Sequence, residues 1–306
     1  MDFEVFILGS SSATPIYQRH PTAQVLKVQE RFFLIDCGEG TLIQLNRYRI
    51  RFHRIDHIFI SHLHGDHYLG LMGLLSTLHL QGRTTDLHVY GPEDLWQIID
   101  LQLRLSDTRL RYPLHFHAVD STRRNVVYAD DIIRVSAIPL QHRIPCTGFL
   151  FEEQERPRKI LKDRLSGLDI KLEDYQGLKE GQDLRLPDGT VIPNSELTQD
   201  PLPSRRYAFC SDTVYDENLG ATLRGVDLLY HESTFLHELE ERARETFHST
   251  ARQAALVAKA ANVKRLILGH FSARYKNLYP MLEEAKEVFP NTTLALEGDR
   301  FSIAAD

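Results

Sequence analysis

The chain has 306 residues, of which 42% are hydrophobic, enough for a substantial buried core in one large domain. Its 42 acidic and 36 basic side chains give a net charge of −6, which taken alone argues against a nucleic-acid partner. The three cysteines are far apart and form no C-x-x-C pair, which indicates a reducing compartment. No apolar stretch approaches the ~20 residues of a membrane span, and the acidic N-terminal residues do not fit a signal peptide. We therefore expect a soluble, cytoplasmic protein.

Predicted strands and helices alternate along the first part of the chain. Short apolar or alternating runs predict strands, and a helical spacing of apolar residues predicts helices. Strands are expected at residues 1–8, 24–28, 32–35, 57–61 and 87–90. Helices are expected at residues 40–48 and 68–80, and another helix is expected after Gly91-Pro92. Strands are expected to dominate from Leu114 to Pro139.

The composition changes between about residues 152 and 203, where charged residues, glycines and prolines accumulate and the apolar periodicity weakens. Asp188-Gly189 predicts a hairpin turn, so the segment is not simply disordered. It also carries the densest basic run of the chain, Arg156 to Arg164. We expect a single domain over residues 1–306 with an inserted, arm-like segment at about 152–203. An ordinary excursion of the core sheet is the alternative.

Alternation of strands and helices returns after Tyr207 and continues to about residue 297. Strands are predicted at residues 207–212 and 265–270, and a helix is predicted from Ala251 to Ala261. Thr250 and Gln253 have the spacing of a capping box at the start of this helix. His248 therefore stands just before a helix N-terminus, where backbone N–H groups attract phosphate. A purely structural histidine before a helix cap is the alternative reading of His248.

Four side chains of metal-ligand type fall within six residues, between a predicted strand and a predicted helix. They form an H-x-H-x-D-H turn made of His62, His64, Asp66 and His67. Imidazole and carboxylate are the ligands that zinc and similar divalent metals take. Alternate residues of an extended turn point the same way, so His62, His64 and Asp66 are expected to converge while His67 aims at a second ion. A polar, histidine-rich loop is the alternative.

Three further candidate ligands stand at or just beyond the ends of predicted strands. They are His142, Asp212 and His270. Open sheets usually place their chemistry at the carboxyl ends of strands. Each residue is weak support on its own, since a single histidine after a strand is more often structural. Their shared placement predicts one site.

Several short motifs resemble the ribonuclease Z family of the metallo-β-lactamase superfamily. The motifs are the H-x-H-x-D-H turn, Leu8–Pro15, Asp36–Thr41, Phe209–Thr213, His231–Thr234 and His248–Ala251. The resemblance covers nearly the whole chain. It departs at Ser211, where the family has glycine, and at Ser233, where the family has alanine. The resemblance implies an α/β fold, a four-layer αβ/βα sandwich of two mixed sheets.

The resemblance also implies a two-metal site. His62, His64 and His142 would hold one zinc ion, Asp66, His67 and His270 would hold another, and Asp212 would bridge them. Manganese or another divalent ion could replace zinc, because both hard and borderline metals accept such ligands.

The reaction implied is removal of the 3′ trailer from tRNA precursors, which leaves a 3′-OH on the tRNA and a 5′-phosphate on the trailer. Asp66 would accept the proton of the attacking water. His248, oriented by Glu232, would protonate the leaving O3′. Arg19 would contribute to gripping the substrate, and the arm would offer phosphate contacts from Arg158, Lys159 and Lys162. A homodimer is expected from the family.

Three other functions fit the same core, because function depends on the surroundings of a site more than on the fold. The first is a smaller phosphodiesterase or a lactone or thioester hydrolase, which would have no use for a basic arm. The second is a diiron redox protein, which would usually carry glutamate at the place of His64. The third is a non-catalytic RNA-binding relative, against which the complete ligand set speaks.

Overall fold

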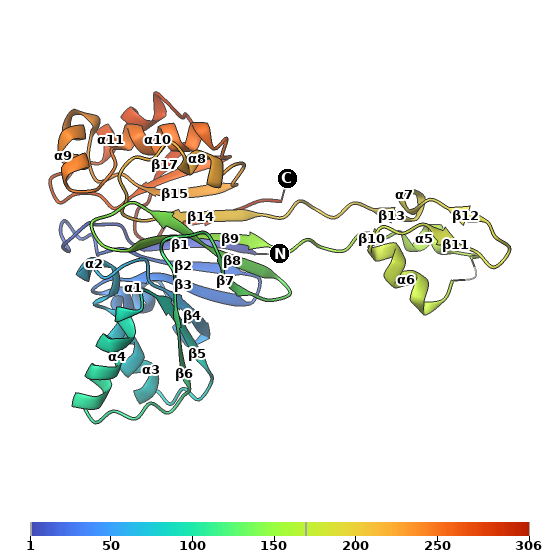
Figure 1. Cartoon of the computed structure of the whole chain (residues 1–306), viewed down its shortest axis with the longest axis horizontal. Coiled ribbons are helices and arrows are strands. Elements are labelled where there is room, and N and C mark those ends of the chain that lie inside the picture. The colour runs from blue at the N-terminus through green and yellow to red at the C-terminus, as the bar shows by residue number, and fades with distance from the viewer. Residues whose placement is uncertain (1, 169, 306) are drawn as a thin grey trace. The chain divides into compact units, whose positions relative to one another are not determined.

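The computed structural model describes residues 2–168 and 170–305, and their contacts divide the chain into two compact units (Figure 1). The larger unit comprises the residues up to 152 together with Arg205–Ala304. The smaller unit is Glu153–Ser204. No helix in these described ranges is both long enough and apolar enough to cross a membrane.

Two seven-stranded sheets form the centre of the larger unit, and each mixes parallel with antiparallel pairs. The first sheet has the order β18-β1-β2-β3-β4-β5-β6, and the second has the order β17-β16-β15-β14-β9-β8-β7. The strands of the first sheet are Phe3–Gly9 (β1), Ala23–Val28 (β2), Arg31–Cys37 (β3), Ile55–Phe59 (β4), Leu87–Gly91 (β5), Leu114–Ala118 (β6) and Arg300–Ser302 (β18). Those of the second are Val126–Ala129 (β7), Ile133–Leu140 (β8), Cys146–Glu153 (β9), Arg206–Cys210 (β14), Leu228–Glu232 (β15), Arg265–Gly269 (β16) and Thr292–Leu294 (β17).

Helices cover the outer face of each sheet (Figure 1). The elements beside the first sheet are Thr41–Arg47 (α1), the 3-10 turn Phe52–Arg54 (η1), Gly65–Tyr68 (α2), Leu71–Leu80 (α3) and Asp94–Leu105 (α4). Those beside the second are Leu219–Thr222 (α8), the 3-10 turn His237–Leu239 (η2), Glu240–Glu245 (α9), Ala251–Ala260 (α10) and Tyr279–Lys286 (α11). The order of layers is therefore helix, sheet, sheet, helix, which confirms the predicted four-layer sandwich.

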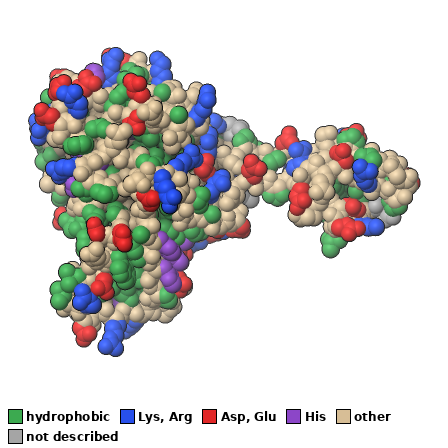
Figure 2. Space-filling view, in the orientation of Figure 1, with side chains coloured by type: hydrophobic (Ala, Val, Ile, Leu, Met, Phe, Trp, Pro, Cys, Tyr) green, Lys and Arg blue, Asp and Glu red, His purple; other side chains and the backbone are tan. Residues whose placement is uncertain are grey.

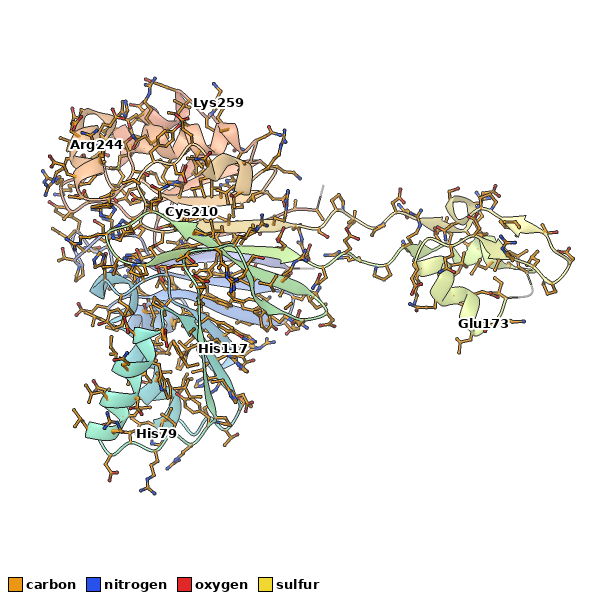
Figure 3. All side chains as sticks on the ribbon, viewed as in Figure 1. His79, His117, Glu173, Cys210, Arg244 and Lys259 are labelled. Carbon is orange, nitrogen blue, oxygen red and sulfur yellow. The ribbon has the colours of Figure 1, made fainter. Side chains whose placement is uncertain are left out.

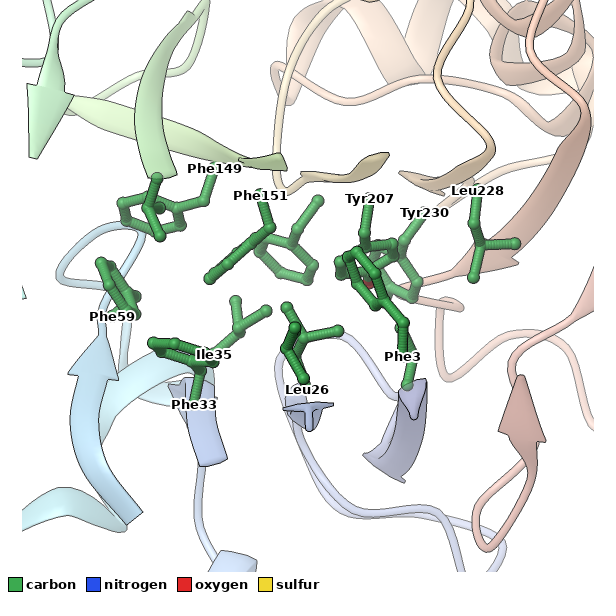
Figure 4. Close-up of a cluster of buried hydrophobic side chains, with 14 of the residues drawn as sticks. Phe3, Leu26, Phe33, Ile35, Phe59, Phe149, Phe151, Tyr207, Leu228 and Tyr230 are labelled. Atoms are coloured by element: carbon green, nitrogen blue, oxygen red, sulfur yellow. The ribbon is translucent and has the colours of Figure 1, made fainter. Parts of the chain in front are cut away.

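Aromatic side chains from both sheets fill the space between them (Figure 4). Phe33 of β3 and Phe59 of β4 pack against Phe151 of β9, with ring centroids 5.7 and 5.5 Å from it. The next residue along β3, Leu34, points the other way and packs under the helices of the first layer. This alternation along one strand lets β3 bury both of its faces.

The helix predicted over residues 68–80 is wrong in its first turn, since the chain forms two helices that meet at Leu69-Gly70. The Gly70 N–H donates a hydrogen bond to the Cys37 carbonyl (2.9 Å) at the end of β3. A Cβ at Gly70 would lie 2.2 Å from the Gly38 carbonyl oxygen, so only glycine allows this approach. By contrast, the predicted helix from Ala251 and its capping box, in which Thr250 and Gln253 pair reciprocally, are confirmed.

The smaller unit folds around a core of its own made of Leu165, Leu178, Leu184 and Leu197. The predicted hairpin is confirmed, because β11 and β12 pair antiparallel around Asp188-Gly189 and Gly189 has a φ of +90°. The strands are Lys159–Ile160 (β10), Leu184–Arg185 (β11), Val191–Ile192 (β12) and Thr198–Gln199 (β13). The helices are Lys162–Leu165 (α5), Leu172–Lys179 (α6) and Asn194–Leu197 (α7).

Candidate metal centre

Two groups of candidate ligands meet in the larger unit, beyond the ends of β4, β8, β14 and β16. The first group contains His62, His64, His142 and Asp212, and the second contains Asp66, His67 and His270. Within each group the ligand atoms lie within 4.8 Å of one another. The structure thus brings together all seven residues that the sequence singled out as ligands.

In the first group, His64 Nδ1 lies 3.1 Å from His62 Nε2 and 3.1 Å from His142 Nε2. Asp212 Oδ2 is 3.5 Å from His62 Nε2. Two nitrogen ligands of a tetrahedral zinc ion stand about 3.3 Å apart, given Zn–N bonds of about 2.0–2.1 Å. The measured separations therefore fit one ion coordinated by all four side chains.

In the second group, His270 Nε2 lies 3.3 Å from Asp66 Oδ2 and 3.2 Å from Asp212 Oδ1. His67 Nε2 lies 3.4 Å from Asp66 Oδ2 and 3.5 Å from Asp212 Oδ1. These separations again match ligands around one ion. Asp212 presents one oxygen to each group, which is the arrangement of a bridging carboxylate.

Two buried atoms in this cluster have no hydrogen-bond partner within the described chain, namely His67 Nε2 and Asp212 Oδ1. Burial lowers the pKa of His67, but the surrounding carboxylates of Asp66, Asp212 and Asp36 raise it well above its usual value. Three carboxylates around one imidazole make a strongly negative site, and unpaired buried polar atoms are costly. Both features fit a bound divalent cation, so the donor set suits the metal that the sequence predicted.

The expected convergence of Asp66 with His62 and His64 is wrong. His64 is extended, with φ −75° and ψ 142°, but α2 begins at Gly65 and turns the next side chains in a new direction. Asp66 and His67 lie together in its first turn and belong to the second group. The turn is therefore half extended and half helical, and this division is what separates the two groups.

An outer layer of polar groups holds the histidines. The ring N–H of His67 donates to Asp36 Oδ2 (2.7 Å), and that of His142 donates to the Phe247 carbonyl (2.9 Å). Ser61 Oγ lies 3.0 Å from His62 Nδ1. Such partners fix the ring orientation and tautomer of metal-binding histidines. Sequence reasoning missed Asp36 as a site residue, although it too stands at the end of a strand.

Ser211 joins this outer layer. Its Oγ lies 3.2 Å from Ser61 Oγ and 3.5 Å from His67 Nδ1. The side chain that replaces the family's glycine therefore points behind the candidate ligands. It does not occupy the space between the two groups.

His248, which is partly buried, and the fully buried Glu232 form a pair beside the candidate ligands. His248 Nδ1 lies 2.9 Å from Glu232 Oε1, and the Thr234 hydroxyl donates to Glu232 Oε2 (2.8 Å). Burial lowers the pKa of His248, but the charge and hydrogen bond of Glu232 outweigh it and raise the pKa to about 9. Since Nδ1 is engaged by Glu232, Nε2 is the nitrogen left to face a substrate. The pair thus has the geometry of a proton donor with its orienting carboxylate.

A cavity of about 650 Å³ opens onto both ligand groups and onto His248. Among the residues of its wall that the sequence did not single out are Arg143, Arg242 and Phe247, together with the acidic Glu39 and Glu245. Arg143 Nη2 lies 3.2 Å from His64 Nε2, and Arg242 pairs with Glu245 at 3.3 Å. The guanidinium group of Arg143 therefore faces the cavity beside a candidate ligand, whereas Arg242 would have to leave Glu245 to meet a phosphate.

The predicted substrate contacts lie outside this cavity wall. Arg19 donates a hydrogen bond to the Tyr275 carbonyl (2.8 Å) and stands over the Tyr17 ring. In the smaller unit, Arg158 bonds Thr198 Oγ1 (2.8 Å) and pairs with Asp200. Lys159 and Lys162 are exposed on the surface of that unit.

Two family models match parts of the chain. The model of the Anti-Pycsar protein Apyc1 matches residues 3–155, and the model of the β-lactamase superfamily domain matches residues 199–271. The second match includes Asp212, Glu232, His248 and His270. Together the two models agree with the observed fold.

Curated relatives match nearly the whole chain. Ribonuclease Z of Bacteroides thetaiotaomicron is 46% identical over 96% of this chain and 93% of its own length. Ribonuclease Z of Cytophaga hutchinsonii is 48% identical over 99% of this chain and 97% of its own length. Among solved structures, the short form of human tRNase Z superimposes with a TM-score of 0.71 at 28% identity, covering 98% of this chain and 99% of that one. Full-length identity at this level shows that the chain belongs to the ribonuclease Z family.

Proposed function

We propose that this metal-dependent endoribonuclease of tRNA 3′ processing holds two zinc ions and cleaves so as to leave a 3′-OH on the tRNA and a 5′-phosphate on the trailer. The observation that carries the proposal is the position of Asp212, whose two oxygens each face one ligand group while a proton donor, His248, stands beside them. Two adjacent ions can stabilise the attacking and leaving oxygens of an in-line phosphodiester hydrolysis, and an acid can protonate the leaving oxygen.

His62, His64 and His142 would hold one ion and Asp66, His67 and His270 the other, with Asp212 between them. When bound, zinc supplies positive charge that lowers the pKa of nearby water and neutralises phosphate oxygens. The remaining chemistry belongs to side chains of this chain.

Proton transfer is assigned to Asp66 and His248. As the water oxygen bonds to phosphorus, Asp66 accepts a water proton. As the bond from phosphorus to O3′ breaks, His248 Nε2 gives its proton to O3′. Glu232 acts as a positioning residue, because its carboxylate fixes the imidazole through Nδ1 and stabilises the protonated ring.

RNA binding is assigned to cations in both units. In the larger unit, Arg143 and Arg242 line the cavity and are placed to meet phosphates near the scissile bond. In the smaller unit, Lys159 and Lys162 are exposed, while Arg158 would have to exchange Asp200 for a phosphate. We assign the smaller unit the role of an RNA-binding arm and keep Arg19 as a support of the substrate entrance.

The assembly proposed is a homodimer in the cytoplasm, where the precursors of tRNA are its substrate. Light scattering on the purified protein tests the dimer, and a mass of one chain, about 35.3 kDa, would contradict it.

The test of function is cleavage of a tRNA precursor that carries a 3′ trailer, run beside bis(p-nitrophenyl) phosphate and mature tRNA. We expect a single cut, a 3′-OH on the tRNA product and about two zinc ions per chain by elemental analysis. Chelation should abolish cleavage, and zinc should restore it. Hydrolysis of the small ester alone would instead indicate a small-molecule phosphodiesterase.

A further inference from the structure

A second group of histidines lies on the sheet surface away from the residues described above. Neighbouring parallel strands bring His57 of β4, His88 of β5 and His115 of β6 into register. The three rings stack, with centroids 5.0 Å apart between the first two and 4.7 Å apart between the last two. His117 follows on β6 and is labelled in Figure 3. Figure 2 shows the resulting row of histidines on the molecular surface.

An acidic residue completes this group with ligand-like spacing. Asp86 Oδ2 lies 3.1 Å from His115 Nε2. One ligand atom each from Asp86, His88 and His115 can be chosen so that all three lie within 4.8 Å of one another. The shorter separation already matches two ligands of one zinc ion, about 3.3 Å apart. The longest separation between ligand atoms of the group would need only a small side-chain rotation to reach this value. His115 and Asp86 can make such a rotation, because their side chains are 44% and 58% exposed.

The ring nitrogens of this group are arranged so that one of them can offer a lone pair to an ion. His117 Nε2 lies 3.0 Å from His88 Nδ1, which leaves His88 Nε2 for an ion and gives His117 the place of an outer support. A plain aromatic ladder on a sheet would need neither Asp86 nor this nitrogen-to-nitrogen contact.

We propose that Asp86, His88 and His115 form a third metal site, independent of the catalytic pair, that takes an exchangeable divalent transition metal such as zinc. Two imidazoles and a carboxylate are a donor set that zinc, nickel and copper accept. Because only three protein ligands reach the ion at this exposed edge of the sheet, water would fill its remaining coordination positions. The ion is therefore held more weakly than one enclosed by four buried side chains.

The experiment is equilibrium dialysis of the full-length protein, with its catalytic ions in place, against increasing zinc. We expect about one additional ion per chain in the wild type, and none in His88→Ala/His115→Ala. The single variant His117→Ala should keep the ion and bind it about 10–100-fold more weakly, as the loss of an outer support does. His53→Ala is the matched control, since His53 is an exposed histidine in none of the candidate ligand groups of the described chain, and it should behave as wild type.

Cleavage of precursor tRNA by each variant shows that the fold and the catalytic ions persist, because none of the substituted residues belongs to the catalytic site. Should the double variant unfold, Asp86→Asn gives the same measurement with an exposed, nearly isosteric change. The same zinc stoichiometry in wild type and in a folded, active His88→Ala/His115→Ala or Asp86→Asn variant would overturn the proposal and leave the assignment of the catalytic site untouched. Cobalt in place of zinc offers a second measurement. The part of its visible absorption that comes from the third site should be absent in the variants that lack the ligands of that site.

Discussion

Glu232 Oε1 lies 2.9 Å from His248 Nδ1, and neither side chain belongs to the two principal ligand groups. Glu232 is fully buried and also receives N–H groups from Thr213 (3.2 Å) and Thr234 (3.0 Å). Burial raises the pKa of this carboxyl, but the charge of His248 and its hydrogen bond lower it overall. The pair therefore forms a fixed ion pair next to the cavity, and its two members can be tested separately.

Replacing His248 by alanine should remove the proton donor and leave the metal in place. General acid catalysis contributes about 10²–10⁴-fold, so kcat should fall within that range. The measurements are single-turnover cleavage of precursor tRNA and elemental analysis on the same sample. Loss of metal together with activity would demote His248 to a structural role.

Replacing Glu232 by glutamine should move the alkaline limb of the pH–rate profile to lower pH. Glu232 raises the pKa of His248 to about 9, and a proton donor works only below its pKa. Activity of the wild type should thus decline as the pH rises through the pKa of His248, and the neutral amide should bring that decline to lower pH. An unchanged profile with reduced kcat would indicate that Glu232 acts only through packing.

Replacing Asp36 by asparagine should weaken metal binding without removing a ligand. Asp36 accepts the hydrogen bond of His67 Nδ1, and the loss of such an outer partner typically costs 10–100-fold in affinity. Titration with a competing chelator measures the change. Asp163→Asn, an exposed change in the smaller unit, is the control. Equal affinities for the two variants would contradict the role assigned to Asp36.

Replacing Arg143 or Arg242 by alanine should raise KM for precursor tRNA and make binding less sensitive to salt. Each lost phosphate contact should lower the slope of log affinity against log salt by about 1. Binding isotherms at several salt concentrations give this slope. Arg104→Ala, on the exposed side of α4, should leave it unchanged. A rise in KM with no change in slope would point to a structural role.

Replacing Phe59 by alanine should destabilise the fold by about 3–5 kcal/mol, the usual cost of truncating a buried phenylalanine. Phe59 is fully buried between the sheets and contacts Phe149 (5.2 Å between centroids) as well as Phe151. Denaturant unfolding measures the loss. Leu105→Ala, whose side chain is 79% exposed, should cost far less. Similar losses for both variants would mean that the inter-sheet aromatic cluster is not the main core.

The gathering of the seven candidate ligands could be predicted from the sequence, because strand ends and clustered histidines are local signals. The two-sheet sandwich was predicted from the resemblance of several short motifs to a known family. The division of the ligands between two ions came from the resemblance, whereas the spacing of the turn alone placed Asp66 with His62 and His64. That spacing argument failed because α2 starts at Gly65 directly after an extended His64. The break at Gly70 was missed for a similar reason, because a single tertiary hydrogen bond to Cys37 decides it. Arg143 was missed although it follows the candidate ligand His142, because the sequence does not show that its side chain turns into the cavity beside His64.

Phe247 has a φ of +59°, a conformation that is strained for a bulky side chain, and its carbonyl supports His142 while the next residue is His248. One backbone kink therefore serves a candidate ligand and the candidate acid at once. The conformational strain arises because the Cβ atom is crowded at positive φ. The hydrogen bond from His142, by contrast, is accepted by a backbone carbonyl, which every residue has. Evolutionary and engineered replacements at this position should accordingly favour glycine or asparagine over valine and isoleucine, whose branched side chains resist left-handed geometry.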